Sequence, residues 1–336
     1  MNLKSILVTG GTGSFGKAFI KEVINSMPNI ERLVIYSRDE LKQWEMQQIY
    51  NEKDYPQLRF FIGDVRDFDR LKMALNGIDC IIHAAALKQV STAEYNPMEF
   101  VKTNVFGAEN IIKASLETQV KKVIALSTDK ASSPVNLYGA TKLCSDKIFI
   151  SANNIVGKKD LSFSVVRYGN VMGSRGSVIP FFLRKAKEGY LPITHKEMTR
   201  FNITLNEGIK MVLWTMKNSK GSEIFVPEIP SYRIMDLAEA IGPNCKKEII
   251  GIRAGEKIHE EMISINDSPV TFKKNNYYLI LPQDPRFNKD YLKEENSIEK
   301  VKDNFFYNSG TNDKFLNIYE IRDLIKENID PNFEPI

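Results

Sequence analysis

The sequence predicts an α/β protein built on a doubly wound parallel sheet, with a smaller α/β lobe toward the C-terminal end. Three observations favour this fold class. Short apolar runs alternate with longer amphipathic segments through the first half of the chain, the apolar runs are unbroken, and a glycine-rich turn follows the first of them. Unbroken apolar runs are typical of strands that helices cover on both faces, and strand–helix alternation is typical of parallel sheets.

The elements of the first half follow in order from this pattern. Strands are expected at 5–9, 32–36, 58–62, 79–85, 122–128 and 162–171. Helices are expected between them, at 15–26, 40–50, 67–75, 97–117 and 137–152. This order is Rossmann-like, so we assign residues 1–170 to a nucleotide-binding domain.

The pattern loosens after about residue 171, where Pro and Gly punctuate shorter segments. Helices are expected at 180–188, 206–217 and 234–241, and strands at 223–226, 247–250 and 276–281. We expect residues 171–202 and 231–336 to form the smaller, substrate-binding lobe, with a return to the first domain near 203–230. The turn-rich tail at 303–315 has no assigned element.

Composition narrows the class of function. A net charge of +4 over 336 residues, without a long Lys/Arg block, favours anionic small molecules over nucleic acid. The chain has neither a signal-peptide apolar region at its start nor an apolar run approaching the ~18 residues of a membrane span. We therefore expect a cytoplasmic protein with no membrane segment.

The cysteines and histidines also bear on the compartment and on metal binding. The cysteines form no CxxC pair, which favours a reducing compartment without a disulfide framework, and the histidines lack metal-ligand spacing. We expect no metal site. These residues are Cys80, Cys144, Cys245, His83, His195 and His259.

The turn "VTGGTGSFGKAF" joins the first strand directly to a helix. Glycines at Gly10, Gly13 and Gly16 let the backbone turn tightly and approach a pyrophosphate, which then lies on the helix N-terminus. Ser14 offers a hydroxyl to the same phosphates. The turn therefore predicts a dinucleotide, and the remaining contact residues expected there are Thr12 and Phe15.

The end of the second strand, "YSRDELK", bears on which dinucleotide is bound. Ser37, Arg38 and Lys42 suit a 2′-phosphate through charge-assisted hydrogen bonds, whereas Asp39 suits a free ribose hydroxyl. The alternative is that Asp39 only caps an exposed helix. The pattern favours NADP over NAD.

Two further strand ends complete the predicted cofactor site. "GDV" follows the third strand, where Asp64 is expected to accept from an adenine amino group beside Val65. "HAAALK" follows the fourth, and its small side chains let the backbone pass close to ribose and nicotinamide. Lys88 then lies within reach of a phosphate or substrate, and the small residues are Ala84, Ala85 and Ala86.

"STDKASSPVNLYGATK" has the composition of a redox site acting on an alcohol. Tyr138 and Lys142 are four residues apart, so they share one helical face, and a nearby ammonium is expected to lower the phenol pKa from about 10. Thr128, at the end of the fifth strand, is expected to hydrogen-bond the same substrate hydroxyl.

With these motifs the sequence resembles the extended short-chain dehydrogenase/reductase family. Within it, "YSRDELK", "HAAALK", "STDKA", "NLYGATK", "RYGNVMGSRGSV", "MTRF" and "GIRAGEK" are similar to the bacterial UDP-N-acetylglucosamine 4,6-dehydratases that invert C5 and begin pseudaminic acid biosynthesis. The resemblance covers roughly residues 3–265. It implies an NADP-dependent enzyme that acts on a UDP-sugar and forms a homo-oligomer, dimer-based or hexameric.

The resemblance also implies a role for a second lysine beside an aspartate. Tyr138 takes the proton of the 4-hydroxyl, Asp129 protonates the departing C6 hydroxyl, and Lys130 removes the C5 proton. A lysine acts as a base only when neutral, and we expect burial and the neighbouring Lys142 to favour the uncharged amine. Lys130 and Tyr138 both stay candidates for returning a proton to C5.

The substrate is expected between the two lobes. Tyr168 is expected to line the nicotinamide, Asn170 to bind the pyrophosphate or sugar, and cations to bind the diphosphate. The residues predicted to contact substrate, besides Lys88, are Asn170, Ser177, Val178, Thr194, Arg200, Arg253 and Glu256.

Three positions depart from the pattern of the enzymes that the sequence resembles. Gln89, Ser91 and Asn202 stand where those enzymes show His, Pro and Trp. These differences bear on the sugar, so a UDP-sugar other than N-acetylglucosamine stays an alternative. The other readings are a retaining 4,6-dehydratase, a UDP-sugar 4-epimerase, and a non-catalytic NADP-binding protein.

Overall fold

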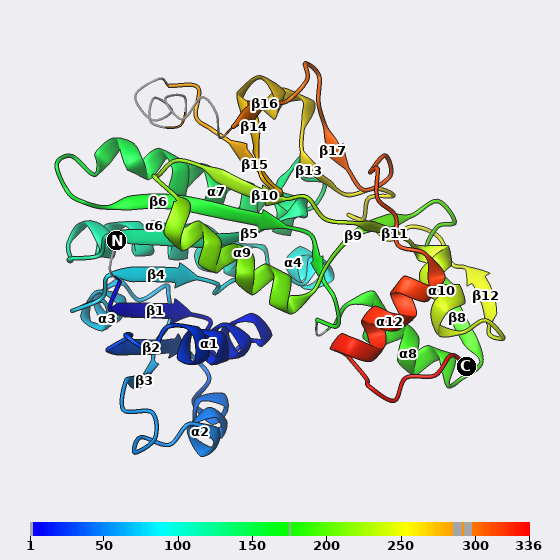
Figure 1. Cartoon of the computed structure of the whole chain (residues 1–336), viewed down its shortest axis with the longest axis horizontal. Helices are drawn as coiled ribbons and strands as arrows, with labels where there is room; N and C mark the ends of the chain where they lie inside the picture. The colour runs from blue at the N-terminus through cyan, green and yellow to red at the C-terminus, as the bar shows by residue number, and fades with distance from the viewer. Residues whose placement is uncertain (1–2, 175, 285–290, 292–297) are drawn as a thin grey trace.

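One large sheet organises the molecule. The computed structural model describes residues 3–174, 176–284, 291 and 298–336, and its largest sheet has the strand order β16-β14-β15-β10-β6-β5-β4-β1-β2-β3 (Figure 1). The segment from β3 to β6 is parallel and has the strand order of dinucleotide-binding folds, which confirms the predicted fold class. Its strands are β1 (Ser5–Thr9), β2 (Arg32–Ser37), β3 (Leu58–Ile62), β4 (Cys80–His83), β5 (Lys122–Thr128) and β6 (Ser162–Tyr168).

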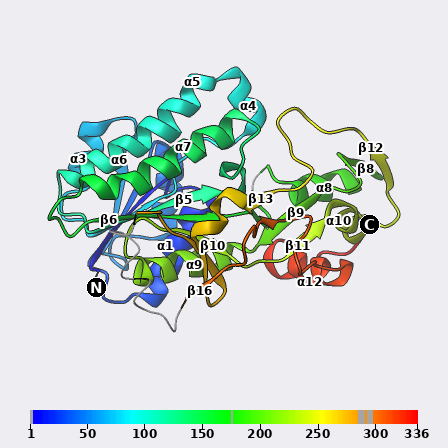
Figure 2. The same ribbon diagram turned by 90° about the horizontal axis from the view of Figure 1, so that it is seen from above.

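Helices cover both faces of this sheet (Figure 2). α3 (Phe68–Ala74), α6 (Gly107–Leu116) and α7 (Leu137–Ala152) lie on one face, and α1 (Ser14–Ser26) and α9 (Leu205–Asn218) lie on the other. β1 is buried along its whole length, which explains its unbroken apolar run. Outside these layers, α2 (Glu40–Ile49) follows β2.

The predicted helix at 97–117 is not regular throughout. α4 (Val90–Tyr95) and α5 (Pro97–Phe100) lead into a π-helical stretch, η1 (Val101–Phe106), before α6 begins. Within η1 the buried Asn104 accepts from the Leu87 amide at 2.9 Å and donates to the Leu87 carbonyl oxygen at 2.9 Å. The irregular turn therefore fixes the loop that follows β4, which borders the site described below.

The chain returns to the large sheet after its first departure. α9 packs beside α1, and β10 (Ile224–Pro227) pairs with β6 in parallel. β15 (Tyr277–Ile280), β14 (Thr271–Lys274) and β16 (Glu299–Lys300) then continue the sheet antiparallel beyond β10. The expectation that 231–336 belongs wholly to the smaller lobe is wrong for these strands, because they cover an edge that β10 would otherwise expose.

The smaller lobe has its own apolar core. Leu191, Ile193, Leu237 and Ile325 are fully buried there. Its elements, at the right of Figure 1, are α8 (Val178–Ala186), β8 (Tyr190–Ile193), α10 (Ile234–Ile241), β12 (Lys246–Ile249) and α12 (Ile318–Asn328). None of the described helices is both long and apolar enough to cross a membrane.

Short strands connect the two lobes. β9 (Thr199–Ile203) lies between β7 (Asn170–Val171) and β11 (Ser231–Arg233), and β13 (Glu261–Ile263) pairs with β17 (Tyr307–Asn308). The tail at 303–315, which sequence reasoning left unassigned, therefore packs against the segment around residue 260. The remaining short helical turns are η2 (Asp129–Ala131), η3 (Asn153–Ile155) and η4 (Ile265–Val270).

Candidate active site

A cavity of about 810 Å³ opens at the carboxyl ends of β1, β2, β4, β5 and β6. This edge of a parallel sheet is where ligands of such folds bind. Most predicted cofactor and catalytic residues line the cavity, whereas Asp129 does not: its side chain is fully buried, in contact with Lys130, which does. The predicted residues along it are Gly10, Thr12, Gly13, Ser14, Phe15, Gly16, Ser37, Arg38, Asp39, Lys42, Asp64, Val65, Ala84, Ala85, Ala86, Lys88, Thr128, Lys130, Tyr138, Lys142, Tyr168, Asn170, Ser177, Arg253 and Glu256.

The glycine turn has the shape of a phosphate cradle. Gly10 has φ +65°, and a Cβ there would come within 3.0 Å of the Ala85 backbone. Gly13 is the N-cap of α1 and has no side chain to cap the helix, so within the described chain the cap residue leaves the first amides of the helix available for an anion. These residues fit the pyrophosphate of a dinucleotide.

At the end of β2, Asp39 is engaged by the protein as a helix cap and is not a free acceptor for a ribose hydroxyl. Its carboxylate caps α2 by accepting from the Lys42 amide at 3.0 Å, and it also pairs with the Lys42 ammonium. Lys42 lowers the pKa of Asp39 through these hydrogen bonds. Ser37 accepts from Thr12 Oγ1 at 3.1 Å, and the half-exposed Arg38 reaches toward the cavity mouth.

Asp64 is already engaged by the protein. Its carboxylate accepts from Arg66 Nε at 2.9 Å and Nη2 at 2.7 Å, while Arg38 Nη1 lies 3.5 Å away. Burial acts to raise the pKa of Asp64, yet the hydrogen bonds from Arg66 hold it below its ordinary value. An adenine contact at this position would share the carboxylate with Arg66.

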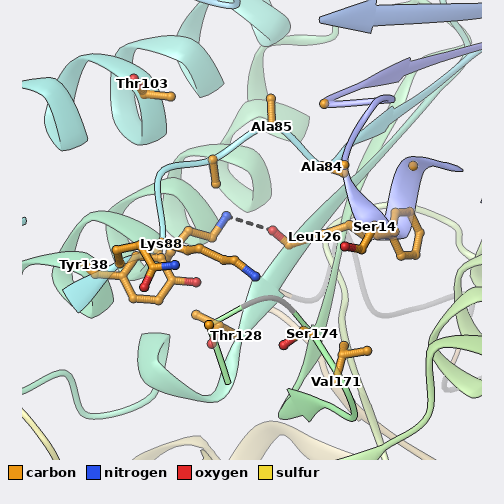
Figure 3. Close-up of a pocket in the computed structure, with 18 of the residues that line it drawn as sticks. Ser14, Ala84, Ala85, Lys88, Thr103, Leu126, Thr128, Tyr138, Val171 and Ser174 are labelled. Carbon is orange, nitrogen blue, oxygen red and sulfur yellow. Dashed lines mark hydrogen bonds between the residues drawn. The ribbon is translucent and has the colours of Figure 1, made fainter. Parts of the chain in front are cut away.

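The loop after β4 passes close to the cradle. Ala84 and Ala85 lie across the cavity from Tyr138 and Thr128, with Lys88 between the two sides (Figure 3). Burial lowers the pKa of Lys88, and the charge of Lys130 acts in the same direction. Thr103, in η1, also lines the cavity, and its buried hydroxyl has no hydrogen-bond partner among the described residues. Sequence reasoning missed Thr103, because a threonine inside an apparent helix gives no signal.

Tyr138 and Lys142 lie on one face of α7, as predicted, but their electrostatics differ from the prediction. Burial raises the pKa of Tyr138 to about 12, and the main cation opposing this rise is Lys130, not Lys142. Lys142 Nζ donates to the Leu126 carbonyl oxygen at 2.7 Å, the dashed line in Figure 3. The expectation that Lys142 brings the phenol pKa down is therefore wrong in this structure.

Lys130 lies between two carboxylates. Its Nζ is 3.1 Å from Asp129 Oδ1 and 3.2 Å from Glu260 Oε1, and it lies 3.4 Å from Asn170 Oδ1. Burial alone would lower the pKa of Lys130, but Asp129 and Glu260 together raise it above its ordinary value. The expectation that burial and Lys142 favour the uncharged amine is wrong here, because the nearest charges are carboxylates.

For Asp129, burial outweighs the neighbouring charges in setting the pKa, whereas for Lys130 the neighbouring charges outweigh burial. Burial is the largest influence and raises the pKa of its carboxyl, while Lys130 and a hydrogen bond from Thr128 Oγ1 at 2.9 Å oppose that rise. The second oxygen, Oδ2, is buried without a partner among the described residues. A carboxyl held in this way retains a proton more readily than an exposed one.

A second cavity, of about 360 Å³, continues from Lys130 and Asn170 toward the smaller lobe. Ser177 caps α8, and its hydroxyl is buried without a partner in the described chain; the same holds for Glu256 Oε2. The predicted residues that line this cavity are Asn170, Ser177, Val178, Thr194, Arg200, Arg253 and Glu256. Unpartnered polar atoms in its wall fit a polar ligand.

The two arginines predicted to bind the diphosphate differ in whether their guanidinium groups are free to do so. Arg200 is buried, and its Nη1 donates to the carbonyl oxygens of Thr199 at 2.6 Å and Ile258 at 3.0 Å. Arg253 is 61% exposed and lies 3.7 Å from Glu256. Arg253 is therefore the freer cation for a diphosphate.

The three positions that depart from the expected pattern do not lie together. Gln89 and Ser91 line the larger cavity, whereas Asn202 is buried in β9 and lines neither cavity. Among the described residues, no group of three or more His, Cys, Asp and Glu side chains is arranged to hold a metal ion.

Comparison with known proteins agrees with this architecture. Residues 6–282 match the family described as polysaccharide biosynthesis protein. The chain is 54% identical, over 96% of its length and 98% of the relative, to a UDP-N-acetylglucosamine 4,6-dehydratase (inverting) of Campylobacter jejuni. It is 39% identical, over 96% and 95%, to a UDP-glucose 4-epimerase of Rickettsia canadensis.

A solved structure has the same fold over nearly the whole chain. Pen from Bacillus thuringiensis is 36% identical, with a TM-score of 0.86 over 96% of this chain and 97% of that one. The chain therefore belongs to the polysaccharide biosynthesis protein family, within the extended short-chain dehydrogenases/reductases.

Proposed function

We propose that the protein is a UDP-N-acetylglucosamine 4,6-dehydratase that inverts C5. The observation that carries this proposal is the 54% identity to the Campylobacter jejuni dehydratase over nearly the full length of both chains. The contact between Asp129 and Lys130, beside Tyr138, supports it, because elimination of water needs an acid and a base in addition to the redox pair.

A nicotinamide nucleotide held at the glycine turn would supply the hydride acceptor at C4 and the hydride donor at C6. Ser37, Arg38 and Lys42 would hold a 2′-phosphate, so we infer NADP. Asp39 is tied to Lys42 as the cap of α2, which leaves it a poorer acceptor for a free ribose hydroxyl. That arrangement supports NADP over NAD.

Tyr138 would take the proton of the substrate 4-hydroxyl at its phenolic oxygen. Lys130 is the largest of the influences that lower the pKa of this buried phenol, and a hydrogen bond with Thr128 acts in the same direction. Lys142, held on the Leu126 carbonyl oxygen, would orient the neighbouring ribose and keep α7 in register with β5.

The acid and the base for elimination would arise together. A proton that moves from Lys130 Nζ to Asp129 Oδ1, across 3.1 Å, turns an ammonium and a carboxylate into an amine and a carboxylic acid. The amine would remove the proton from C5, the electron pair would form the C5–C6 double bond, and Asp129 would protonate the departing hydroxyl so that water leaves. No net proton is needed to prepare the pair, because the proton only moves from one partner to the other.

The diphosphate and the sugar would occupy the second cavity. Arg253 would pair with the diphosphate, while Asn170, Ser177, Val178, Thr194 and Glu256 would surround the nucleotide sugar, and Arg200 would brace the wall. Lys88 would reach the substrate from the first cavity. Cytoplasmic location, a homo-oligomer, and a place in pseudaminic acid biosynthesis stay predictions.

The test is product analysis by NMR after incubation with UDP-N-acetylglucosamine and NADP in deuterated water. A 4-keto-6-deoxy product with deuterium at C5 and inverted configuration is the expected result. The same product with retained configuration would replace inversion by retention, and recovery of unchanged sugar would contradict the proposal.

A 4-epimerase is the second candidate, because the Rickettsia canadensis relative carries that name at 39% identity. Formation of UDP-N-acetylgalactosamine without loss of water would establish it. Epimerisation leaves the Asp129–Lys130 pair without a task, which is why it ranks second.

A further inference from the structure

Glu260 is a buried carboxylate in contact with Lys130 to which sequence reasoning assigned no role. It lies in "KIHEEM", directly before β13, and its side chain is 3% exposed. Its Oε1 lies 3.2 Å from Lys130 Nζ and 3.8 Å from Arg200 Nε. Glu260 therefore connects the lysine of η2 to the smaller lobe.

The backbone at Glu260 is fixed by the C-terminal tail. Its amide donates to Ser309 Oγ at 2.9 Å, and its carbonyl oxygen accepts from the Ser309 amide at 2.8 Å. Ser309 Oγ also lies 2.7 Å from Thr199 Oγ1 on β9. These bonds hold the carboxylate at a defined position, which a flexible loop would not do.

One oxygen of this carboxylate is left over. Glu260 Oε2 is buried and has no hydrogen-bond partner among the described residues. A purely structural ion pair would be expected to satisfy both oxygens, since a buried unpaired acceptor costs about 1–3 kcal/mol. Glu260 also lines the second cavity together with Lys130 and Asn170.

We propose that Glu260 is a positioning residue that anchors the Lys130 amine and strengthens its hold on a proton during the dehydration. The inference rests on the proposed function for its catalytic meaning. When the amine has taken the C5 proton, the ammonium again lies between Asp129 and Glu260, so the proton does not fall back onto the substrate during loss of water. The bond made is Nζ–H and the bond broken is C5–H, and the departing hydroxyl takes its proton from Asp129.

Groups from several elements face Lys130 and must be counted in its titration. Asp129 lies beside it on η2, Glu260 precedes β13 and Arg200 lies on β9. Tyr138 on α7, Tyr232 on β11 and Lys88 in the loop after β4 also interact with its charge. The two carboxylates outweigh burial and raise the pKa of Lys130. Burial acts to raise the pKa of Glu260, but the charges of Lys130 and Arg200 hold it below its ordinary value.

The experiment is competitive labelling of lysines with acetic anhydride over a range of pH, read by peptide mass spectrometry. It needs no turnover, so it separates this inference from the proposed function. Glu260→Gln keeps the shape and removes the charge, and the half-labelling pH of Lys130 should fall by about one unit or more. Glu261→Gln is the matched control, because Glu261 accepts from Ser132 and Ser133 hydroxyls and not from Lys130.

An unmoved Lys130 profile in Glu260→Gln would overturn the inference, whatever the activity of the enzyme. If that variant does not fold, the unmodified chain supplies the measurement: Lys130 should label at higher pH than Lys142, and the reverse order would overturn the inference. Where dehydration is measured, the limb of the kcat–pH profile that belongs to Lys130 should move with the labelling, while KM stays near its normal value, and Glu260→Asp should restore most of the shift.

Discussion

Two lysines border the same cavity, and the structure surrounds them differently. Lys130 on η2 lies between Asp129 and Glu260, and its pKa is raised. Lys142 on α7 donates to the Leu126 carbonyl oxygen, and burial lowers its pKa even though the charge of Asp146 opposes the change. Both side chains are largely buried, so burial alone does not set the direction.

The difference lies in what each neighbouring carboxylate does. Asp146 is occupied by Ser127 Oγ at 2.7 Å and Arg167 Nη2 at 3.1 Å, so it acts on Lys142 only at a distance. The carboxylates around Lys130 contact it, and each has one oxygen with no hydrogen-bond partner among the described residues. Asp146 is thus held in place by other groups near Lys142, whereas the two carboxylates beside Lys130 pair directly with its ammonium.

The largest expected effect comes from removing Lys130, the base of the proposed elimination. Lys130→Met should lower the rate of dehydration by about 10³-fold or more, because general-base catalysis at C5 is lost while the cavity keeps its volume. Binding of NADP, measured by fluorescence or calorimetry, should stay near its normal value. Lys147→Met, at an exposed lysine of α7, is the control. Near-normal turnover by Lys130→Met would end the proposed role.

Breaking the buried ion pair between Asp146 and Arg167 should lower the stability of the fold more than the rate of the reaction. Asp146→Asn leaves Arg167 buried, 3% exposed, without its carboxylate, and such losses cost about 3–5 kcal/mol. The free energy of unfolding from urea titration should fall by that order. Asp236→Asn removes the carboxylate of the exposed Arg233 pair and should change it by less than about 1 kcal/mol. Equal effects of the two variants would contradict this comparison.

Sequence reasoning found the parts of the site that lie within one short segment. The glycine turn, the Asp129–Lys130 pair, Tyr138 and Lys142 each follow a strand end or share one helix, so local spacing places them. Glu260 joins Lys130 only because β13 pairs with β17 and the tail folds back, contacts that no local pattern encodes. For the same reason the strands β14 and β15 were not expected in the large sheet, and the protonation of Lys130 was misjudged.

His83 provides a third test of the comparison, in which burial lowers the pKa of a buried base unless a carboxylate contacts it. His83, at the end of β4, lies 2.9 Å from Thr9 Oγ1, and burial lowers its pKa from 6.5 to about 3. The unfolded chain binds the proton first, so the stability that His83 contributes is present above pH 6.5 and is lost as the pH falls toward 3. The slope due to His83 should approach about 1.4 kcal/mol per pH unit in this window. His83→Asn should flatten that slope in urea titrations, and an unchanged slope would count against the assignment.

The smallest effect is expected at the exposed end of the cavity, where solvent screens the charges. Arg38 is 52% exposed and lies 3.5 Å from Asp64, so its ion pair contributes little to the fold. Arg38→Ala should weaken NADP binding by roughly tenfold, about 1.4 kcal/mol, because one charge-assisted bond to a 2′-phosphate is lost. NAD binding should stay constant, since it lacks that phosphate.

Arg59→Ala serves as the control for this last change. Arg59 is a β3 arginine whose guanidinium donates to the Pro56 and Leu58 carbonyl oxygens, and it does not line the cavity. Titration of both nucleotides into each variant separates loss of the 2′-phosphate contact from a general loss of charge. If Arg38→Ala weakens NAD as much as NADP, Arg38 shapes the cavity mouth and does not select the cofactor. The expected contrast with Lys130→Met comes from burial together with direct ion pairs, because Lys130 is 22% exposed between two buried carboxylates, whereas Arg38 is 52% exposed and its charge is screened by solvent.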